Sequence, residues 1–338
     1  MSNRNGNDRG SDKTSGGSKK PGFKLGQKPR ASKSVDKTFA FETDDRPRMH
    51  KPRAEKQTQP QNDMRLGEFI IERMGHDGRG ITQWNGKTLF VDGAMTGERI
   101  SARLVQEHSR YAEARVDKLL EPSLRRENPV CVHYTLCGGC QVQHIHSAEQ
   151  LALKEQVVVE QLERWGGVKA KHMLPPITSP ATGYRRSARL GVWYEDEFVT
   201  LGFRKRNSKQ LVEINDCAVL VPELNRLLAP LKSWLVELRS AKPVTHIEFI
   251  RSDNRSVIVL RHTKPLAAAD LQNLTILAVE YDFDAFLQGS DARQLQDLHG
   301  NNVDPRLTYT LADFNLELTF HPQDFIQVNS SVNAQMVA

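Results

Sequence analysis

Hydrophobic and polar residues alternate along residues 65–120, which indicates half-buried β-strands. Ile100, Ala102 and Leu104 are separated by polar side chains, and the same period of two returns at residues 112–116. Turn-forming sequences separate the runs, namely His76-Asp77-Gly78-Arg79-Gly80, Asn85-Gly86 and Asp92-Gly93. We therefore predict a small antiparallel β-barrel in this part of the chain.

The period changes to that of a helix at residue 147. Ser147 and Gln150 have the spacing of a capping box, and apolar residues then recur on one face as far as Gly166-Gly167. The residues of this face are Leu151, Val158, Leu162 and Trp165. A single amphipathic helix is predicted here.

The pattern beyond residue 184 mixes strands and helices. Alternation at Ala188, Leu190 and Val192 begins a run of strands that leads into Cys217, and a leucine stripe at 224–238 predicts a helix that Pro230 should kink. The later elements are a hairpin at 247–250 and 257–260, a helix at 266–278, and strands at 307–311 and 316–320. The fold class is therefore α+β, in several domains.

Charge is unevenly distributed along the 338 residues. Residues 1–60 hold 15 Lys/Arg against 7 Asp/Glu, whereas the rest of the chain has a net charge of −2. Few apolar residues occur in 1–62, so we predict a disordered basic tail that attracts an anionic partner such as nucleic acid; a tail that only improves solubility is the alternative. The chain opens without an apolar signal segment and has no apolar run that could span a membrane, so we expect a cytoplasmic protein.

The cysteines form the candidate chemical site. Cys131, Cys137 and Cys140 fall within ten residues of one another, and Cys217 is the fourth cysteine of the chain. Two residues between Cys137 and Cys140 allow both thiolates to reach one metal centre from a tight turn, and a four-thiolate site would join two remote segments. Iron–sulfur clusters and structural zinc sites both use such ligands.

Other interpretations of the cysteines carry less weight. Disulfides require an oxidising compartment, and a redox pair at Cys137 and Cys140 would lack the βαβ context of thioredoxins and leave Cys131 unexplained. A structural zinc site remains the alternative to an iron–sulfur cluster. The gap of five residues after Cys131 is wider than zinc sites ordinarily have, which favours iron–sulfur.

Basic residues on the predicted strands are candidates for RNA contacts. In the barrel these are Arg79, Lys87, Arg99 and Arg103, and in the central region they are Arg185, Arg186, Arg204, Lys205 and Arg206. Phosphate groups would be their partners. For each of them the alternative is an ordinary solvated surface charge.

Several motifs together resemble the bacterial RNA uracil-C5 methyltransferases. The resemblance rests on Cys131-x5-Cys137-Gly-Gly-Cys140-Gln-Val-Gln-His144, on Ile214-Asn215-Asp216-Cys217, and on Asp324-Phe325-Ile326-Gln327-Val328-Asn329 followed by Val332-Asn333. It covers about residues 63–338. The barrel, with Gly93-Ala94-Met95-Thr96-Gly97-Glu98, is similar to an OB-like TRAM domain. A TRAM domain before the cluster points to the branch that acts on 23S rRNA, because the tRNA enzyme of the family lacks both parts.

The resemblance implies a function and a set of site residues. It implies a 4Fe-4S cluster on Cys131, Cys137, Cys140 and Cys217 with a structural, RNA-positioning role. It also implies that Gln327 contacts S-adenosyl-L-methionine and that Phe325 lies beside the target base. The expected activity is methylation of C5 of a uridine in 23S rRNA, by a monomer.

The chain departs from the family pattern at its end. In the family, the glycine-rich turn that holds the cofactor, the nucleophilic cysteine and the general base lie beyond the position of Ala338. We therefore expect no catalytic residue in these 338 residues and no methylation by them alone.

The resemblance also gives domain boundaries. These are a tail at 1–62, the TRAM barrel at 63–122, an iron–sulfur and central α+β RNA-binding domain at 123–321, and the beginning of a Rossmann-like methyltransferase domain at 322–338. The alternative function is a non-catalytic TRAM-type RNA-binding factor with a structural zinc site. A radical methylthiotransferase also combines a cysteine cluster with a TRAM domain, but its cysteine spacing and domain order are different.

Overall fold

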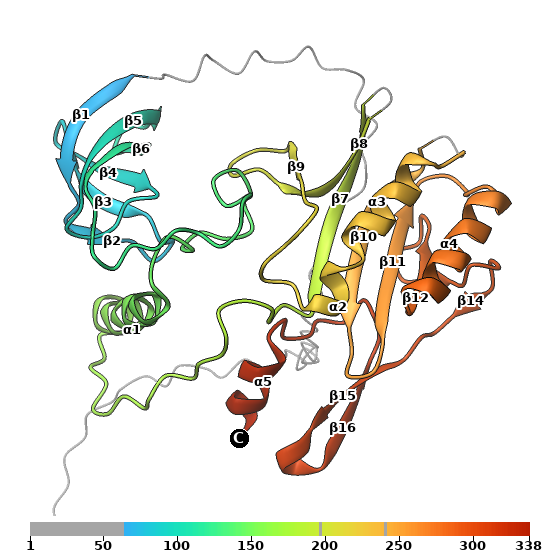
Figure 1. Ribbon diagram of the computed structural model, residues 1–338. Helices are drawn as coiled ribbons and strands as arrows, with labels where there is room; N and C mark the ends of the chain where they lie inside the picture. The colour runs from blue at the N-terminus through green and yellow to red at the C-terminus, as the bar shows by residue number, and fades with distance from the viewer. Residues whose placement is uncertain (1–63, 196–197, 240–241) are drawn as a thin grey trace, which may run out of the picture. The chain divides into compact units, whose positions relative to one another are not determined.

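The computed structural model describes residues 64–195, 198–239 and 242–338 (Figure 1). The tail predicted at 1–62 lies outside the described residues. Within the described ranges the strands form a six-stranded sheet, an eight-stranded sheet and a two-stranded ribbon. The α+β fold class predicted from the sequence is confirmed.

Strands β1 to β6 form the six-stranded sheet, in the order β1-β5-β6-β4-β3-β2. Their bounds are Arg65–Ile70 (β1), Arg73–Met74 (β2), Gly80–Trp84 (β3), Lys87–Asp92 (β4), Arg99–Glu107 (β5) and Tyr111–Glu121 (β6). Ile100, Ala102 and Leu104 are buried in one hydrophobic core, as the alternation predicts. A fully antiparallel sheet is the wrong prediction, because β4 and β6 pair in parallel. Strand β5 lies between β4 and β6 in the sequence and is antiparallel to β6. The chain therefore reverses its direction in β5, and β6 runs in the same direction as β4.

Helix α1 (Ser147–Arg164) follows a segment of turns at residues 122–146. The predicted Ser147 cap is wrong by one position. His146 is the N-cap, and its Nδ1 accepts a hydrogen bond from the Ala148 N–H at 3.3 Å. The Gln150 side chain donates instead to the Ile145 carbonyl at 2.9 Å, so it binds the segment that leads into the helix.

The eight-stranded sheet has the order β14-β13-β12-β11-β10-β7-β8-β9. Its strands are Ser187–Glu195 (β7), Phe198–Arg204 (β8), Leu211–Glu213 (β9), Val244–Arg251 (β10), Ser256–His262 (β11), Phe283–Gln288 (β12), Leu295–Gln296 (β13) and Asn302–Val303 (β14). The predicted hairpin is confirmed as β10 and β11. Only β11 and β12 pair in parallel among these strands, and α4 (Ala268–Glu280) makes the crossover between them.

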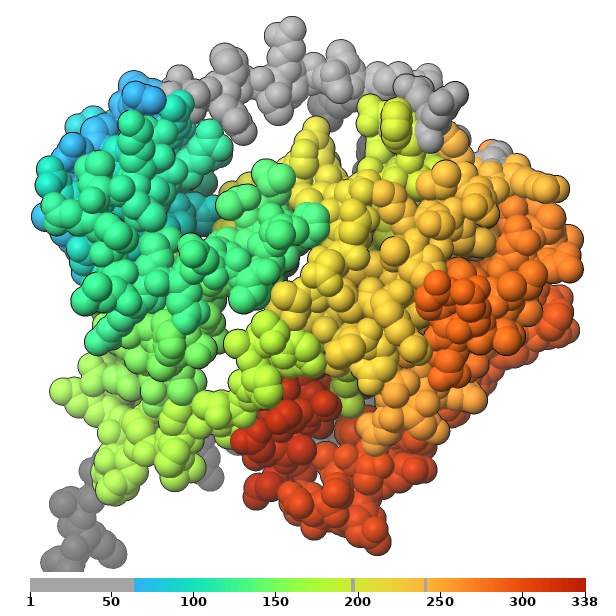
Figure 2. Space-filling model, in the orientation of Figure 1, coloured from blue at the N-terminus to red at the C-terminus, as the bar shows by residue number. Residues whose placement is uncertain are grey.

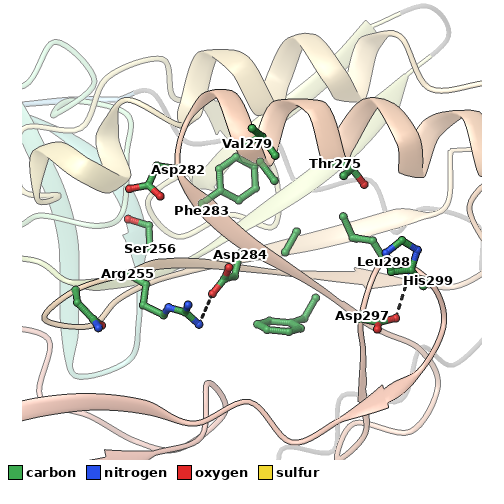
Figure 3. Close-up of a pocket in the computed structure, with 14 residues that line it drawn as sticks. Arg255, Ser256, Thr275, Val279, Asp282, Phe283, Asp284, Asp297, Leu298 and His299 are labelled. Atoms are coloured by element: carbon green, nitrogen blue, oxygen red, sulfur yellow. Dashed lines mark hydrogen bonds and ion pairs between the residues drawn. The ribbon is translucent and has the colours of Figure 1, made fainter.

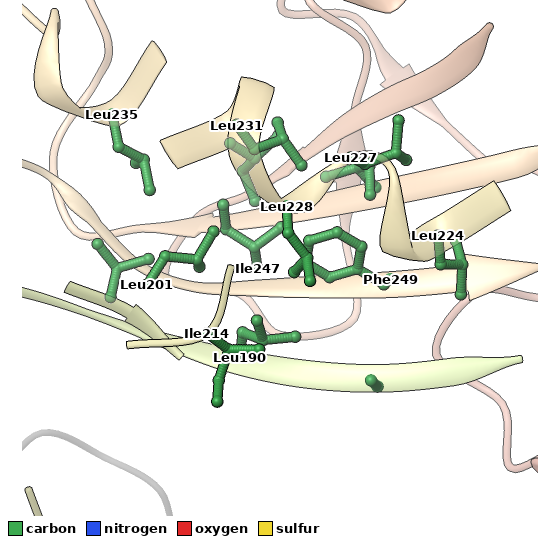
Figure 4. Close-up of a cluster of buried hydrophobic side chains, with 14 of the residues drawn as sticks. Leu190, Leu201, Ile214, Leu224, Leu227, Leu228, Leu231, Leu235, Ile247 and Phe249 are labelled. Carbon is green, nitrogen blue, oxygen red and sulfur yellow. The ribbon is translucent and has the colours of Figure 1, made fainter. Parts of the chain in front are cut away.

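The leucine stripe forms two short helices, α2 (Pro222–Asn225) and α3 (Leu228–Val236). Their leucines pack on Ile247 and Phe249 of β10 in the main hydrophobic core (Figure 4). The predicted kink at Pro230 is wrong. The helix breaks before Leu228, and Pro230 lies in the first turn of α3, where a missing N–H leaves no hydrogen bond unmade.

The last described elements are a two-stranded ribbon and a helix. The ribbon consists of β15 (Leu307–Leu311), a 3₁₀ turn η1 (Ala312–Phe314) and β16 (Leu316–Phe320), and α5 spans Ser330–Val337. Asn329 caps α5, since its Oδ1 accepts from the Val332 N–H at 3.0 Å, and its Nδ2 donates to the Ser179 hydroxyl at 2.7 Å. Figure 2 shows these C-terminal residues in red against the yellow-green residues near 180.

Candidate functional site

The cysteine segment at 131–140 consists of successive turns. The Tyr134 N–H donates to the Cys131 carbonyl at 3.1 Å, and the Cys137 N–H donates to the His133 carbonyl at 2.8 Å. Gly138 donates its N–H to the Arg204 carbonyl at 2.9 Å, so this segment is joined to the end of β8. A Cβ at Gly138 would lie 3.1 Å from the same carbonyl oxygen, which explains why glycine fits there.

Cys217 belongs to the same hydrophobic core as Cys137. Its N–H donates to Oδ1 of Asn225 at 2.8 Å, and its carbonyl accepts from the Leu220 N–H at 3.0 Å. The Cys137 side chain is 8% exposed and that of Cys217 is 9% exposed, and both belong to the main hydrophobic core, with Cys140 packed against it. The fold thus brings the two cysteine-bearing segments together although nearly eighty residues separate them, as the sequence numbering shows.

The thiol groups influence one another electrostatically. Burial raises the pKa of Cys137 and that of Cys217, and negative charge on Cys140 and Cys131 raises both pKa values further. All four described cysteines are free thiols, which is inconsistent with the disulfide alternative. Among the described residues, no three His, Cys, Asp or Glu side chains are arranged to hold a single metal ion.

Arg206 contacts the cysteine segment, although the sequence analysis predicted a different role for it. We predicted it as an RNA contact, but its Nη2 donates to the Cys140 carbonyl at 2.5 Å and to the Tyr134 carbonyl at 3.4 Å. The guanidinium carbon lies 4.9 Å from the centroid of the Tyr134 ring, and Nη1 is 3.2 Å from Oδ1 of Asp92 in β4. Arg206 therefore holds together the cysteine segment, the β8–β9 turn and the six-stranded sheet.

Two further polar pairs flank the cysteine segment, and neither pairing was predicted from the sequence. The Tyr134 hydroxyl and Nδ1 of His144 lie 2.6 Å apart, and both residues are buried. Arg126 binds the fully buried carboxylate of Glu98 through Nε and Nη2, each at 2.6 Å. The Met95 and Ser123 N–H groups also donate to this carboxylate. Both pairs connect residues too far apart in the chain to produce a periodic signal.

The basic residues predicted on the six-stranded sheet are engaged with acids of the same sheet. Arg79 pairs with Asp77 and Glu113, and Lys87 with Glu107. Arg99 pairs with Glu68 and Glu121, and Arg103 with Asp117. Their positive charge is therefore largely compensated within the sheet. The sequence pattern could not show this, because cross-strand partners are set by register.

The five basic residues predicted in the central region have different surroundings. Arg185 donates through Nε to the Ser187 carbonyl at 3.0 Å, and Arg186 is buried. Arg204 is exposed, and Lys205 contacts only an amide oxygen, Oε1 of Gln210 at 3.1 Å, among its described side-chain partners. Arg204 is thus the exposed member of this group, and the partly exposed Lys205 lies next to it beside the cysteine turn.

Phe325 and Gln327 lie in the segment before α5. The Phe325 ring is 85% exposed, and Gln327 is also exposed, whereas Ile326 between them packs against a hydrophobic cluster with Leu307 and Phe320. Both candidate site residues are therefore exposed, on either side of the packed Ile326 in the sequence. The segment is held from behind by Arg186, which donates through Nε to the Gln327 carbonyl at 2.9 Å.

One described hollow lies elsewhere, between α4, β12 and the turn at 297–299 (Figure 3). Arg255 and Asp284 form an ion pair at 2.8 Å in it, and the His299 N–H donates to Oδ1 of Asp297 at 2.9 Å. None of the predicted site residues lines this hollow. None of the helices in the described ranges has the length and apolar composition of a membrane span.

Comparison with known proteins identifies related sequences. No family model matches the chain. A protein of Aeromonas salmonicida named 23S rRNA (uracil(1939)-C(5))-methyltransferase is 38% identical over 285 residues, which make up 84% of this chain and 63% of that protein. One of the same name from Hahella chejuensis is 36% identical over 271 residues, or 79% of this chain and 60% of the relative. The chain thus spans about 60% of the length of these relatives.

A solved structure has a similar fold. The tRNA (uracil-54, C5)-methyltransferase of Pyrococcus abyssi, in complex with S-adenosyl-L-homocysteine, has a TM-score of 0.56 and 18% identity. The match covers 80% of this chain and 63% of that one. At this level of identity the match shows a similar fold, and the fold does not by itself separate rRNA from tRNA as substrate.

Proposed function

Because this chain is homologous to the bacterial 23S rRNA uracil-C5 methyltransferases, we propose that it contributes the RNA-docking part of an enzyme that methylates C5 of a uridine in 23S rRNA with S-adenosyl-L-methionine. The resemblance seen in the sequence motifs is confirmed by these relatives. The choice of rRNA over tRNA rests on them. The observation that carries the proposal is their identity of 36–38% over about four fifths of the chain.

The cysteine set fits an iron–sulfur cluster. The four thiols come from two segments, and Cys137 and Cys217 each respond to charge on Cys131 and Cys140. The gap of five residues between Cys131 and Cys137 is wider than zinc sites ordinarily have, and for this reason we propose a 4Fe-4S cluster over zinc.

The proposed cluster has a structural role. Cys131, Cys137, Cys140 and Cys217 would hold it, and it would join the cysteine segment to the loop before α2. The apolar side of the site supplies shielding from solvent, since Cys137 and Cys217 lie in the main core. With all four cysteines assigned as ligands, none of them is left as the nucleophile of methyl transfer.

The six-stranded sheet is proposed to be a TRAM domain. Its bounds in this assignment are 63–122, followed by the central RNA-binding domain at 123–321 and the start of a Rossmann-like methyltransferase domain at 322–338. RNA phosphates would be bound chiefly by Arg204 and Lys205, which present uncompensated charge beside the cysteine turn. Arg79, Lys87, Arg99 and Arg103 are assigned a smaller part because acids of the sheet neutralise them.

Gln327 and Phe325 are proposed to face the methyl donor and the target base. Both residues are exposed, as residues that receive ligands must be. An aromatic ring that is 85% exposed offers a face on which an unstacked base can lie. We further propose that the protein acts in the cytoplasm as a monomer; light scattering coupled to size exclusion tests the oligomeric state.

Metal analysis tests the cluster. We expect anaerobically purified protein to be brown and to contain about four iron and four sulfide per chain, as four-thiolate clusters do. Cys217→Ser should lose most of the iron, whereas the neighbouring control Asp216→Asn should keep it. One zinc per chain without iron would instead support the alternative, a non-catalytic RNA-binding factor.

RNA binding tests the docking surface. An unmodified 23S rRNA transcript that contains the uridine of the relatives should bind, and Arg204→Gln with Lys205→Gln should weaken binding by about tenfold and reduce its salt dependence. The matched pair Arg99→Gln with Arg103→Gln removes equal charge from the sheet and should change the dissociation constant by about twofold at most. Equal losses in both pairs would contradict the assignment.

A further inference from the structure

The dipeptide Arg185-Arg186 lies between two segments that are distant in the sequence. The Arg185 N–H donates to the Val219 carbonyl at 2.8 Å, and the Arg186 N–H donates to the Val328 carbonyl at 2.8 Å. Arg185 also forms an antiparallel bridge with Asn329. The main chain at 185–186 thus connects the loop of Cys217 to the segment that carries Phe325 and Gln327.

The side chain of Arg186 binds the same segment from within the protein. The residue is only 4% exposed. Its Nε donates to the Gln327 carbonyl at 2.9 Å, and its guanidinium carbon lies 4.7 Å from the centroid of the Tyr309 ring in β15. Main-chain and side-chain bonds from one residue therefore fix two successive carbonyl groups, those of Gln327 and Val328.

The buried position of Arg186 also carries an energetic cost. Burial lowers the pKa of Arg186, although Tyr309 and Asp253 partly oppose the fall. Its Nη2 is buried without a hydrogen-bond partner among the described residues. An unpaired buried donor on a charged group is destabilising, and an apolar side chain of similar length would fill the space without that cost.

We propose that Arg186 is a positioning residue, which fixes the peptide between Gln327 and Val328 so that Phe325 and Gln327 keep the orientation in which they meet the target base and the methyl donor. This inference rests on the proposed function for the roles of those two side chains. It adds a residue whose effect on methyl transfer is exerted through the segment at 325–329 and not through contact with either ligand.

The same contacts relate the cysteine centre to this segment. The Leu220 N–H donates to the Cys217 carbonyl at 3.0 Å, and the Val221 N–H donates to the Arg185 carbonyl at 3.1 Å. A short series of main-chain bonds therefore runs from Cys217 through 219–221 to Arg185, and from Arg186 to Val328. A cluster bound at Cys217 would restrict the motion of its loop. Through these hydrogen bonds it would also restrict the motion of the segment at 325–329.

Hydrogen exchange measured by mass spectrometry on the 338-residue chain tests the proposal. In Arg186→Met we expect the amides of residue 186, Val332 and Asn333 to exchange at least about tenfold faster, because the segment and its Asn329 cap move away from β7. The melting temperature should change by about 4 °C or less, since methionine fills a similar volume and removes an unpaired donor. If Arg186 had a purely structural role, its substitution would raise the exchange rates and lower the melting temperature together.

Two further variants make the comparison specific. Arg186→Lys can donate to the Gln327 carbonyl but lacks the planar guanidinium that stacks on Tyr309, so its exchange should fall between that of the parent and of Arg186→Met. If Arg186→Met does not fold, the comparison of amide exchange is made between Arg186→Lys and the parent protein. Arg189→Met, three residues along β7, should leave exchange at these amides unchanged, because Arg189 contacts Glu248.

The outcomes separate this proposal from the proposed function. Parental exchange rates in both Arg186 variants, or an equal rise in Arg189→Met, would overturn the positioning role even if the chain binds 23S rRNA. Binding of the rRNA transcript by Arg186→Met should stay within about twofold of the parent, because a buried guanidinium contacts no phosphate. A loss of binding as large as that of Arg204→Gln with Lys205→Gln would make Arg186 a direct RNA contact and overturn the proposal as well. If the parent binds no rRNA, the proposed function fails while the exchange result stands.

Discussion

Arg126 and Glu98 form a two-point ion pair in which Nε and Nη2 of the guanidinium each lie 2.6 Å from a carboxylate oxygen. Burial would raise the pKa of Glu98, but hydrogen bonds from Arg126, Ser123 and Met95 lower it below its usual value. Nη2 of Arg126 also donates to the Gly93 carbonyl at 2.7 Å. The pair joins the six-stranded sheet to the segment that leads to the cysteines.

Glu98→Gln should therefore destabilise the protein strongly. The substitution leaves a half-buried guanidinium without its counter-charge and a fully buried amide in place of the carboxylate, and we expect the free energy of unfolding to fall by about 3 kcal/mol in urea titrations. The control Glu107→Gln breaks the more exposed pair with Lys87 and should cost about 1 kcal/mol at most. Replacing both partners, Glu98→Leu with Arg126→Met, should cost less than Glu98→Gln; a larger cost would contradict this account.

His144 should make stability depend on pH. Burial lowers its pKa to about 4 from the ordinary 6.5, and the positive charge of Arg126 adds to the fall. Between these values the unfolded chain takes up a proton that the folded protein does not, so the stability present above pH 6.5 is lost as the pH falls toward 4. The expected loss is about 3 kcal/mol.

Urea titrations from pH 7 to pH 4 measure this loss. His144→Gln keeps a polar group beside the Tyr134 hydroxyl and cannot titrate, so its stability should vary less over the same range. An unchanged pH dependence in His144→Gln would show that other groups cause it.

Arg206→Met should weaken the cysteine site. It removes the donor to the Cys140 and Tyr134 carbonyls and leaves them without that bond, which costs about 1–3 kcal/mol for buried acceptors. Iron per chain after anaerobic purification should fall by at least about half if the segment no longer holds its shape. Arg204→Met, which removes an exposed charge two residues away, is the matched control for metal content. Full iron content in Arg206→Met would refute the role assigned to this contact.

Helix α1 should bind hydrophobic dyes. None of its residues is buried, and its apolar face exposes Val158, Leu162 and Trp165, the last at 79%. Leu162→Lys should reduce dye fluorescence by roughly half, because the apolar stripe is interrupted at its centre. It should change the free energy of unfolding by about 0.5 kcal/mol at most. Leu231→Ala in the core serves as the contrast, with an expected cost of about 2–5 kcal/mol.

The predictions that succeeded from sequence rest on local patterns. Alternation at Ile100, Ala102 and Leu104 predicted strands because burial on one face repeats every two residues. The hairpin of β10 and β11 was predictable for the same reason. The predicted cap at Ser147 failed because His146 can perform the same function, and the pattern contains no rule that separates the two.

The basic residues show where local patterns are insufficient. Arg99 and Arg103 alternate with buried residues, which predicted correctly that they face outward from the core. Their acidic partners lie on β1 and β6, and only strand register places them opposite. Arg186 and Arg206 were grouped with solvent-facing residues, yet the fold surrounds both with carbonyl groups and aromatic rings.

The sequence by itself determined the α+β class, the half-buried strands, and the four cysteines as the candidate centre, because hydrophobic period and residue chemistry are properties of neighbouring positions. The tertiary structure alone decided that Cys217 meets the cysteine turn, that the sheet's arginines are neutralised, and that Arg186 fixes the carbonyl of Gln327. These contacts join residues far apart in the chain, and their geometry depends on how the packed sheets bring separate segments into register.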